Sequence, residues 1–221
     1  MLAKDLVSDV VPPLRTSDTG AIALNWMDVF KINHLPIVNN SELLGLISDA
    51  DIFDLNCADE PVGNHSLSLN RPYALADQHI YEVLDLFSKL KLSALPVLDS
   101  KSEYQGLIIA ADLLHQASNL MAVNHPGGIL VLELNENDYM LSQIAQIVEG
   151  NDAKILSLYI HSIPDSTRIE LTIKVNRTDL SSILQTFNRY NYQIKASYKD
   201  KNAADEMFND RYDLFIKYLS I

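Results

Sequence analysis

The stretch Leu35-Pro36-Ile37-Val38 returns sixty residues later as Leu95-Pro96-Val97-Leu98. Each copy is followed by a polar turn and then by a second apolar run. These runs read Gly45-Leu46-Ile47-Ser48-Asp49-Ala50-Asp51 in the first copy and Gly106-Leu107-Ile108-Ile109-Ala110-Ala111-Asp112 in the second, with the same glycine-to-aspartate spacing. An internal repeat of this kind indicates that one structural unit occurs twice along the chain.

A helical pattern precedes each Leu-Pro pair. Apolar residues recur there at steps of three and four, which places them on one buried helix face. They are Ile22, Trp26, Val29 and Phe30 in the first copy and Ile80, Val83, Leu84, Phe87 and Leu90 in the second. Asp18 and Asp77 are the predicted N-caps of these helices. Each copy therefore predicts a helix, a short strand, a hairpin turn, a short strand and a helix.

A helix followed by Leu-Pro and two apolar residues, a polar hairpin and then Gly-apolar-apolar-Ser-x-x-Asp resembles the CBS domain. Two copies in tandem resemble the CBS pair, or Bateman module, over roughly residues 3–119. The resemblance implies an α/β fold with repeats over residues 1–60 and 61–120, related by a pseudo-twofold axis. It also implies an adenosyl ligand, such as AMP, ATP or S-adenosylmethionine, bound in the cleft between the repeats.

The resemblance further implies which residues contact that ligand. One carboxylate can accept hydrogen bonds from both hydroxyls of a ribose, and Asp51 and Asp112 occupy the family position of this carboxylate. Ser48 occupies the hydroxyl position that bonds ribose or phosphate, whereas Ile109 in the second copy can donate nothing. We therefore expect the first site to be the stronger one. The alternative is that both aspartates only cap the helices that follow them.

Other residues are expected to border the cleft. His34 directly precedes the first Leu-Pro pair, and Pro36 and Pro96 are predicted at strand edges. Arg15 and Arg71 precede the first helix of each copy, where a ligand of this family enters. For the arginines the alternative is a solvated surface position, and for His34 it is packing.

The charge of the chain limits the class of ligand and partner. Seventeen basic and twenty-nine acidic residues give a net charge of −12, and no run of Lys or Arg occurs. A protein that binds nucleic acid needs a basic face, so we expect none of that binding. An anionic nucleotide needs local cations. If neither arginine faces the cleft, AMP, adenosine or the cationic S-adenosylmethionine is favoured over ATP.

Catalytic motifs are missing from the sequence. The seven glycines form no phosphate-binding loop, the six histidines show no metal-ligand spacing, and no nucleophile elbow occurs. The single cysteine, Cys57, lies in an acidic stretch that disfavours a thiolate. No apolar run has the length and composition of a signal peptide or membrane span. We expect a non-enzymatic cytoplasmic protein that requires no metal or cofactor.

The second half of the chain predicts a different domain. The breaker cluster His125-Pro126-Gly127-Gly128 marks residues 121–128 as a linker. Strand patterns at 129–134, 153–160, 168–175 and 192–198 are separated by two helical patterns, the second with a predicted cap at Asn176 or Thr178. The order strand, helix, strand, strand, helix, strand over residues 129–198 is that of the ferredoxin-like fold.

In size and position this domain is similar to the ACT domain. A CBS pair followed by an ACT domain resembles the bacterial regulatory proteins of the acetoin-utilisation type, which implies small-molecule sensing or dimerisation. The loop after the first strand carries Glu136 and Asp138 and no glycine. These acids would occupy the helix N-terminus that a ligand carboxylate requires, which disfavours an amino-acid ligand there and favours dimerisation.

The tail, residues 199–221, predicts a further helix. Its apolar stripe consists of Met207, Phe208, Tyr212, Phe215 and Leu219. Such a stripe has to be buried, either on the protein itself or, as we expect, on a second subunit of a homodimer. Two functions remain open. The chain is a sensor with a good adenosyl site, whose ACT-like domain relays the signal or dimerises, or it is an oligomerising scaffold without a metabolite.

Overall fold

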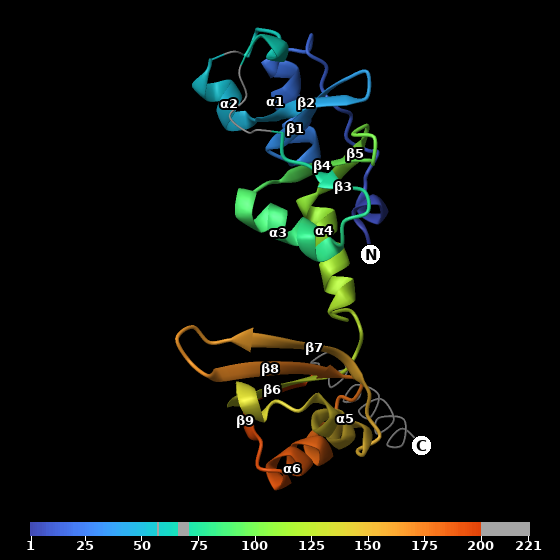
Figure 1. The fold of residues 1–221 in the computed structure, drawn as a ribbon, viewed down its shortest axis with the longest axis vertical. Helices are drawn as coiled ribbons and strands as arrows, with labels where there is room; N and C mark the ends of the chain where they lie inside the picture. The colour runs from blue at the N-terminus through green and yellow to red at the C-terminus, as the bar shows by residue number, and fades with distance from the viewer. Residues whose placement is uncertain (57, 66–70, 200–221) are drawn as a thin grey trace, which may run out of the picture. The chain divides into compact units, whose positions relative to one another are not determined.

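The computed structural model describes residues 1–56, 58–65 and 71–199 (Figure 1). The chain divides into two compact units, one of residues 1–116 and one that begins at residue 117. Cys57 and the helix predicted in the tail lie outside the described residues, apart from Lys199. Among the residues that are described, no helix combines the length and apolarity needed to cross a membrane.

The first unit consists of two copies of one pattern, as the repeat predicts. The first copy contains α1 (Gly20–Phe30), β1 (His34–Asn39), β2 (Glu42–Ser48) and α2 (Asp49–Asp54). The second contains β3 (Ala74–Leu75), α3 (Ile80–Leu90), β4 (Ala94–Leu98), β5 (Tyr104–Ile109) and α4 (Ala110–Leu120). β1 and β2 form one antiparallel hairpin and β4 and β5 the other. The predicted order of helix, strand, hairpin, strand and helix is confirmed in both copies.

Each repeat is completed by the segment that precedes the other one. The N-terminal 3-10 helix η1 (Ala3–Leu6) places Ala3 and Leu6 in the core of the second repeat, and Ser8 pairs with Leu107 of β5. The 3-10 helix η2 (Val62–Asn64) in turn contributes Val62 to the core of the first repeat. Part of each leading segment is therefore exchanged, whereas Leu14 pairs with Ile37 of its own repeat and β3 pairs with β4 of its own repeat.

The repeats also meet at equivalent residues. The Asn33 N–H donates a hydrogen bond to Ser93 Oγ at 2.8 Å, and these residues lie sixty positions apart. Glu42 and Glu103, at the start of the second strand of each hairpin region, form an isolated bridge. Contacts between equivalent positions at two places are what a pseudo-twofold axis requires.

The predicted caps of α1 and α3 are wrong by one and two residues. α1 is capped by Thr19, whose Oγ1 accepts from the Ile22 N–H at 3.4 Å, and α3 is capped by His79. Asp18 instead accepts a hydrogen bond from the Arg15 N–H at 2.7 Å. The aspartate closes the turn before the helix rather than the helix itself.

The second unit has the predicted ferredoxin-like topology. Its elements are β6 (Gly128–Asn135), η3 (Glu136–Asp138), α5 (Leu141–Glu149), β7 (Ile155–Ser162), β8 (Arg168–Val175), α6 (Ser181–Arg189) and β9 (Gln193–Lys199). The sheet is antiparallel in the order β7-β8-β6-β9. The cap predicted at Asn176 or Thr178 is wrong, because α6 begins at Ser181 with Leu180 as N-cap.

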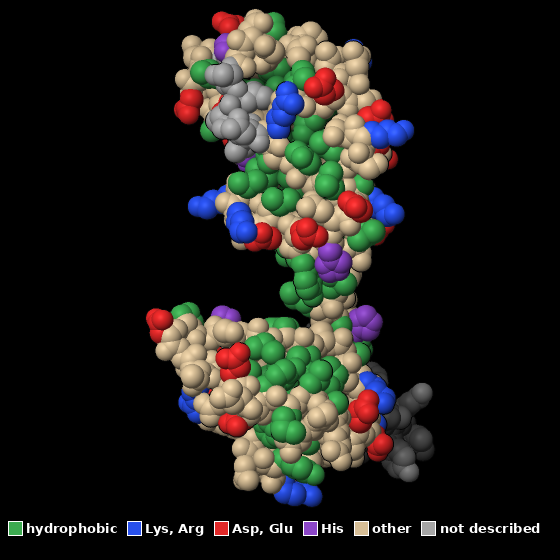
Figure 2. Space-filling view, in the orientation of Figure 1, with side chains coloured by type: hydrophobic (Ala, Val, Ile, Leu, Met, Phe, Trp, Pro, Cys, Tyr) green, Lys and Arg blue, Asp and Glu red, His purple; other side chains and the backbone are tan. Residues whose placement is uncertain are grey.

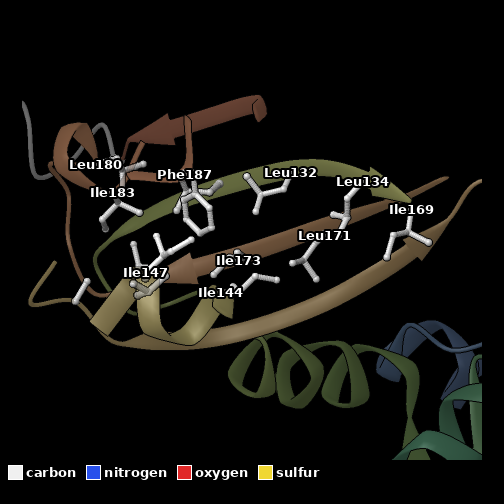
Figure 3. Close-up of a cluster of buried hydrophobic side chains, with 14 residues drawn as sticks. Leu132, Leu134, Ile144, Ile147, Ile169, Leu171, Ile173, Leu180, Ile183 and Phe187 are labelled. Carbon is white, nitrogen blue, oxygen red and sulfur yellow. The ribbon is translucent and has the colours of Figure 1, made fainter. Parts of the chain in front are cut away.

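The core of the second unit lies on one face of this sheet (Figure 3). Leu132, Leu171 and Ile173 point from β6 and β8 toward the two helices, where they meet Ile147 of α5 and Phe187 of α6. The alternate residues of the same strands, which are only partly buried, point to the opposite face. In the described part of this unit, both α-helices thus contribute to the same core.

Candidate functional site

An open groove lies beside Asp112 in the first turn of α4. It has a volume of about 250 Å³, and its other wall is formed by Asp5, Val7 and Ser8 of the N-terminal segment, with His115 one turn further along α4. Asp112 is exposed. The groove therefore offers carboxylate and hydroxyl acceptors beside an apolar side chain, and it exists because the N-terminal segment crosses to the second repeat.

The equivalent aspartate of the first repeat has a different environment. Asp51 and Ser48 are 8% and 9% exposed. Asp51 Oδ2 accepts hydrogen bonds from the Ser48 N–H at 2.8 Å and from the Ser48 hydroxyl at 2.7 Å, while the Asp51 N–H donates to Ser48 Oγ at 3.1 Å. This reciprocal pair caps α2. The capping role that the sequence left open is thus present at Asp51.

His34 joins this pair to the second repeat. It lies opposite Ser48 in the β1–β2 hairpin, and its Nδ1 accepts from the Ser93 N–H at 3.2 Å and lies 2.9 Å from Ser93 Oγ. Burial lowers the pKa of His34, against the opposing effect of the Asp49 and Asp51 carboxylates. The neutral imidazole is the form that can accept these hydrogen bonds.

Two members of this polar cluster were missed by the sequence analysis. Ser93 contacts both Asn33 and His34, and the Asn33 side-chain amide donates to Asp49 Oδ2 at 2.6 Å. The signal that could have found them is the repeat itself. Asn33 and Ser93 are equivalent polar residues directly before the two buried Leu-Pro strands, where the pseudo-twofold axis brings the copies together.

The two arginines and two prolines that were predicted to border the cleft lie neither in the groove at Asp112 nor in the polar cluster around Asp51. The Arg71 side chain is exposed and its Nε donates to the Leu44 carbonyl at 2.9 Å, and Arg15 is also exposed. Pro36 and Pro96 are buried within β1 and β4. Neither arginine lines the groove at Asp112.

Ile109, which replaces the hydroxyl residue in the second repeat, is partly buried and packs against the hydrophobic core of the first repeat. Its side chain therefore has a structural role. The residue that departs from the family pattern helps to hold the two repeats together.

Basic and acidic side chains are mixed on one face of the first unit. On the face of the first unit shown in Figure 2, Lys and Arg side chains stand singly among acidic ones. Among the described residues, no group of three or more His, Cys, Asp or Glu side chains is arranged to hold a metal ion.

A polar groove of about 340 Å³ lies at the loop of the second unit that the ACT resemblance singles out. Asn135, Asp138 and Gln143 line it, together with Arg168 and Tyr192. The Tyr192 hydroxyl lies 2.7 Å from Gln143 Oε1, and burial raises the pKa of this tyrosine. Asp138 at this loop accepts from the Asn135 amide at 3.1 Å. Glu136 and Asp138 form η3, and the first turn of α5, which begins at Leu141, holds no acidic residue, so the predicted position of these acids at the helix N-terminus is wrong.

Comparison with known proteins identifies the first unit. Residues 4–56 and 68–119 each match the CBS domain family. A curated relative, inosine-5'-monophosphate dehydrogenase of Methanocaldococcus jannaschii, is 25% identical over 128 residues, which are 58% of this chain and 25% of the relative. The chain thus spans about a quarter of the length of that enzyme.

Solved structures are similar to about half of the chain. An acetoin utilization protein from Vibrio cholerae is 23% identical with a TM-score of 0.49, covering 56% of this chain and 95% of the other. A CBS domain pair in complex with 5'-methylthioadenosine and S-adenosyl-L-methionine is 26% identical with a TM-score of 0.44, covering 53% of this chain and 99% of the other. The resemblance of residues 129–198 to the ACT domain stays a prediction.

Proposed function

The N-terminal half of this chain is a tandem pair of CBS domains, and from this premise we propose that the protein is a non-enzymatic regulator that binds an adenosyl ligand. The observation that carries the proposal is the groove at Asp112, closed on its far side by the N-terminal segment. The ACT-like domain relays the bound state or holds two chains together as a homodimer.

The chemistry of the groove fits a nucleoside. The exposed Asp112 carboxylate can accept charge-assisted hydrogen bonds from two neighbouring ribose hydroxyls. Val7 and Leu6 supply apolar surface for the adenine ring, and Ser8 supplies a further polar group. The absence of a hydroxyl at Ile109 is offset in this proposal by Ser8, which belongs to the leading segment of the other repeat.

The charge of the groove selects among adenosyl ligands. Asp5 and Asp112 both line it and neither Arg15 nor Arg71 does. A triphosphate would meet uncompensated negative charge, whereas the sulfonium of S-adenosylmethionine would be attracted. We therefore expect S-adenosylmethionine or adenosine to bind more tightly than AMP, and AMP more tightly than ATP.

Binding at this groove can regulate because both repeats contribute to it. A ligand shifts a conformational equilibrium only by its different affinity for the two states. Here the ligand would bridge α4 and the N-terminal segment, so it would favour the state in which that segment is docked on the second repeat.

A thermal-shift series tests the proposal. At about 100 times its dissociation constant, a ligand adds about 2.7 kcal/mol of stability, which for a chain of this size raises Tm by several degrees. We expect the largest rise with S-adenosylmethionine and none with ATP at equal concentration. Asp112→Asn should abolish the rise, and the matched control Asp77→Asn, an exposed aspartate before α3, should retain it.

The same series distinguishes the two repeats. A rise that survives Asp112→Asn and disappears with Asp51→Asn would move the ligand to the first repeat. No rise with any adenosyl compound would contradict the sensor proposal.

A second candidate function, self-association without a metabolite, is favoured by one observation. Phe53 of α2 and Leu114 of α4 are 67% and 71% exposed and occupy equivalent positions of the two repeats. Exposed apolar side chains in a symmetric pair suit a contact with a second copy of the chain. A scaffold of this kind would form the dimer and show no thermal shift.

A further inference from the structure

A second hollow lies on the face of the second unit's sheet that α5 and α6 do not cover. Its volume is about 330 Å³. The floor is formed by Ile129 of β6, Thr172 and Lys174 of β8, Tyr159 of β7 and Tyr198 of β9. Ile129, Thr172 and Lys174 alternate along their strands with the buried residues of the core, so they point away from it.

The linker predicted at residues 121–128 closes one end of this hollow. Lys174 Nζ donates a hydrogen bond to the Val123 carbonyl at 3.0 Å, and Ser157 Oγ donates to the Met121 carbonyl at 2.8 Å. The linker is therefore fixed to β7 and β8 by side chains of the sheet. The result is a groove with a wall rather than a flat sheet surface.

The groove exposes much apolar surface in the described part of the unit. Tyr159 and Tyr198 are 50% and 58% exposed, and Met121 and Val123 on the wall are 50% and 56% exposed. Four large side chains gathered around one hollow are more than the scattered apolar residues of an ordinary surface. An exposed apolar surface of this kind indicates that another segment or molecule binds there.

The segment that follows β9 has the position, length and chemistry for this role. It begins at Asp200, directly after Lys199, which itself lines the groove. A helix over residues 205–221 would be about 25 Å long, close to the roughly 26 Å of an eight-residue strand such as β8.

Charge is complementary as well. The groove carries Lys174 and Lys199, whereas residues 200–221 hold five acidic and three basic side chains. On a helix, Asp205 lies at the edge of the apolar stripe that begins at Met207. The stripe can therefore lie on the tyrosines and Ile129 while Asp205 approaches a lysine of the groove.

We propose that residues 200–221 of the same chain dock in this groove and cover the open face of the sheet. Attachment at Lys199 favours the chain's own segment over that of a second copy, because a short tether gives an effective concentration in the millimolar range. Docking would cover the ferredoxin-like sheet on both faces.

Thiol protection in the full chain tests this inference. Thr172→Cys is placed in the floor of the groove, on a background in which the native thiol is removed by Cys57→Ser. We expect this thiol to react with Ellman's reagent on the order of tenfold more slowly in the full chain than in a chain ending at Lys199. Phe208→Asp with Phe215→Asp in the full chain should restore fast reaction without shortening it.

Two controls make the outcome decisive. Ser182→Cys, on the exposed surface of α6, should react equally fast in all three chains. Equal rates for Thr172→Cys in the full and shortened chains would overturn the proposal. Protection that falls on dilution together with the mass measured by light scattering would also overturn it, because the groove would then be occupied by a second copy.

Discussion

Gly106 shows how strongly a single position can govern the first unit. It lies in β5 with a φ of 142°, a conformation that side chains rarely adopt, and a Cβ there would overlap Cγ1 of Val7. The N-terminal segment crosses the second repeat at this point, where Ser8 pairs with Leu107. The absence of a side chain is what permits the crossing, and with it one wall of the groove at Asp112.

We expect Gly106→Ala to lower the free energy of unfolding by about 1–3 kcal/mol, because the new methyl overlaps Val7 and the backbone is strained. Urea denaturation measures the change. Combining it with Val7→Ala should recover the steric part of the loss and leave the part due to φ. A stability equal to that of the wild type would contradict the close approach of the two segments.

His34 predicts a pH dependence. Burial holds the pKa of its imidazole below the ordinary value of 6.5, so the unfolded chain binds this proton more readily than the folded one. Stability should therefore rise with pH through the window below about 6.5 and be complete above it. In the folded state, protonation at Nδ1 would remove the acceptor of the Ser93 N–H.

His34→Gln should flatten the dependence of unfolding free energy on pH between about pH 5 and pH 7, the region in which a histidine changes charge. His125→Gln, at an exposed position in the linker, serves as the matched control and should keep the slope of the wild type. An unchanged slope in His34→Gln would show that the contact with Ser93 does not govern the titration.

At the scale of secondary structure, α2 depends on the reciprocal cap made by Ser48 and Asp51. Ser48→Ala removes the acceptor of the Asp51 N–H and one donor to its carboxylate in a buried place. We expect a loss of about 1–2 kcal/mol, measured by thermal or urea unfolding. Ser17→Ala, at an exposed position before α1, should change stability by less than about 0.5 kcal/mol.

Much of the element order could be predicted from the sequence. The steps of three and four located both helices, and in α3 the predicted Ile80, Val83 and Phe87 are buried. The buried face predicted for α1 is wrong, because Ile22 and Val29 are 39% and 61% exposed while Ala23 and Met27 are buried. The strand predicted at residues 168–175 coincides with β8. The caps were misplaced because Asp18 and Thr19 are both good capping residues, and only the backbone decides which one precedes the first turn.

The candidate site was less predictable. The motif located Asp51 and Asp112, but nothing local indicates that one aspartate is buried in a cap while the other lines a groove. The groove at Asp112 is formed by the N-terminal segment, which packs on the distant second repeat through long-range contacts. The sequence repeat identifies equivalent residues in the two copies. It does not predict which distant segments contact each of them.

At the scale of the whole molecule, the exposed pair Phe53 and Leu114 predicts an interface between two chains. We expect the wild type to have twice the 24.8 kDa mass of one chain, and Phe53→Asp with Leu114→Asp to reduce it to one, since buried charges without partners destabilise an interface. Light scattering after size exclusion measures this. Val10→Asp, an equally exposed apolar position outside these helices, should leave the mass unchanged. A monomeric wild type would exclude the interface.

The exchange of segments between the repeats affects the stability of either repeat when it is produced as a separate fragment. If the gene were cut between its two copies, the first fragment would carry η1, which packs in the second repeat. The second fragment would carry η2, which packs in the first repeat. Neither fragment would then own a finished interior, although each would contain every motif of the family.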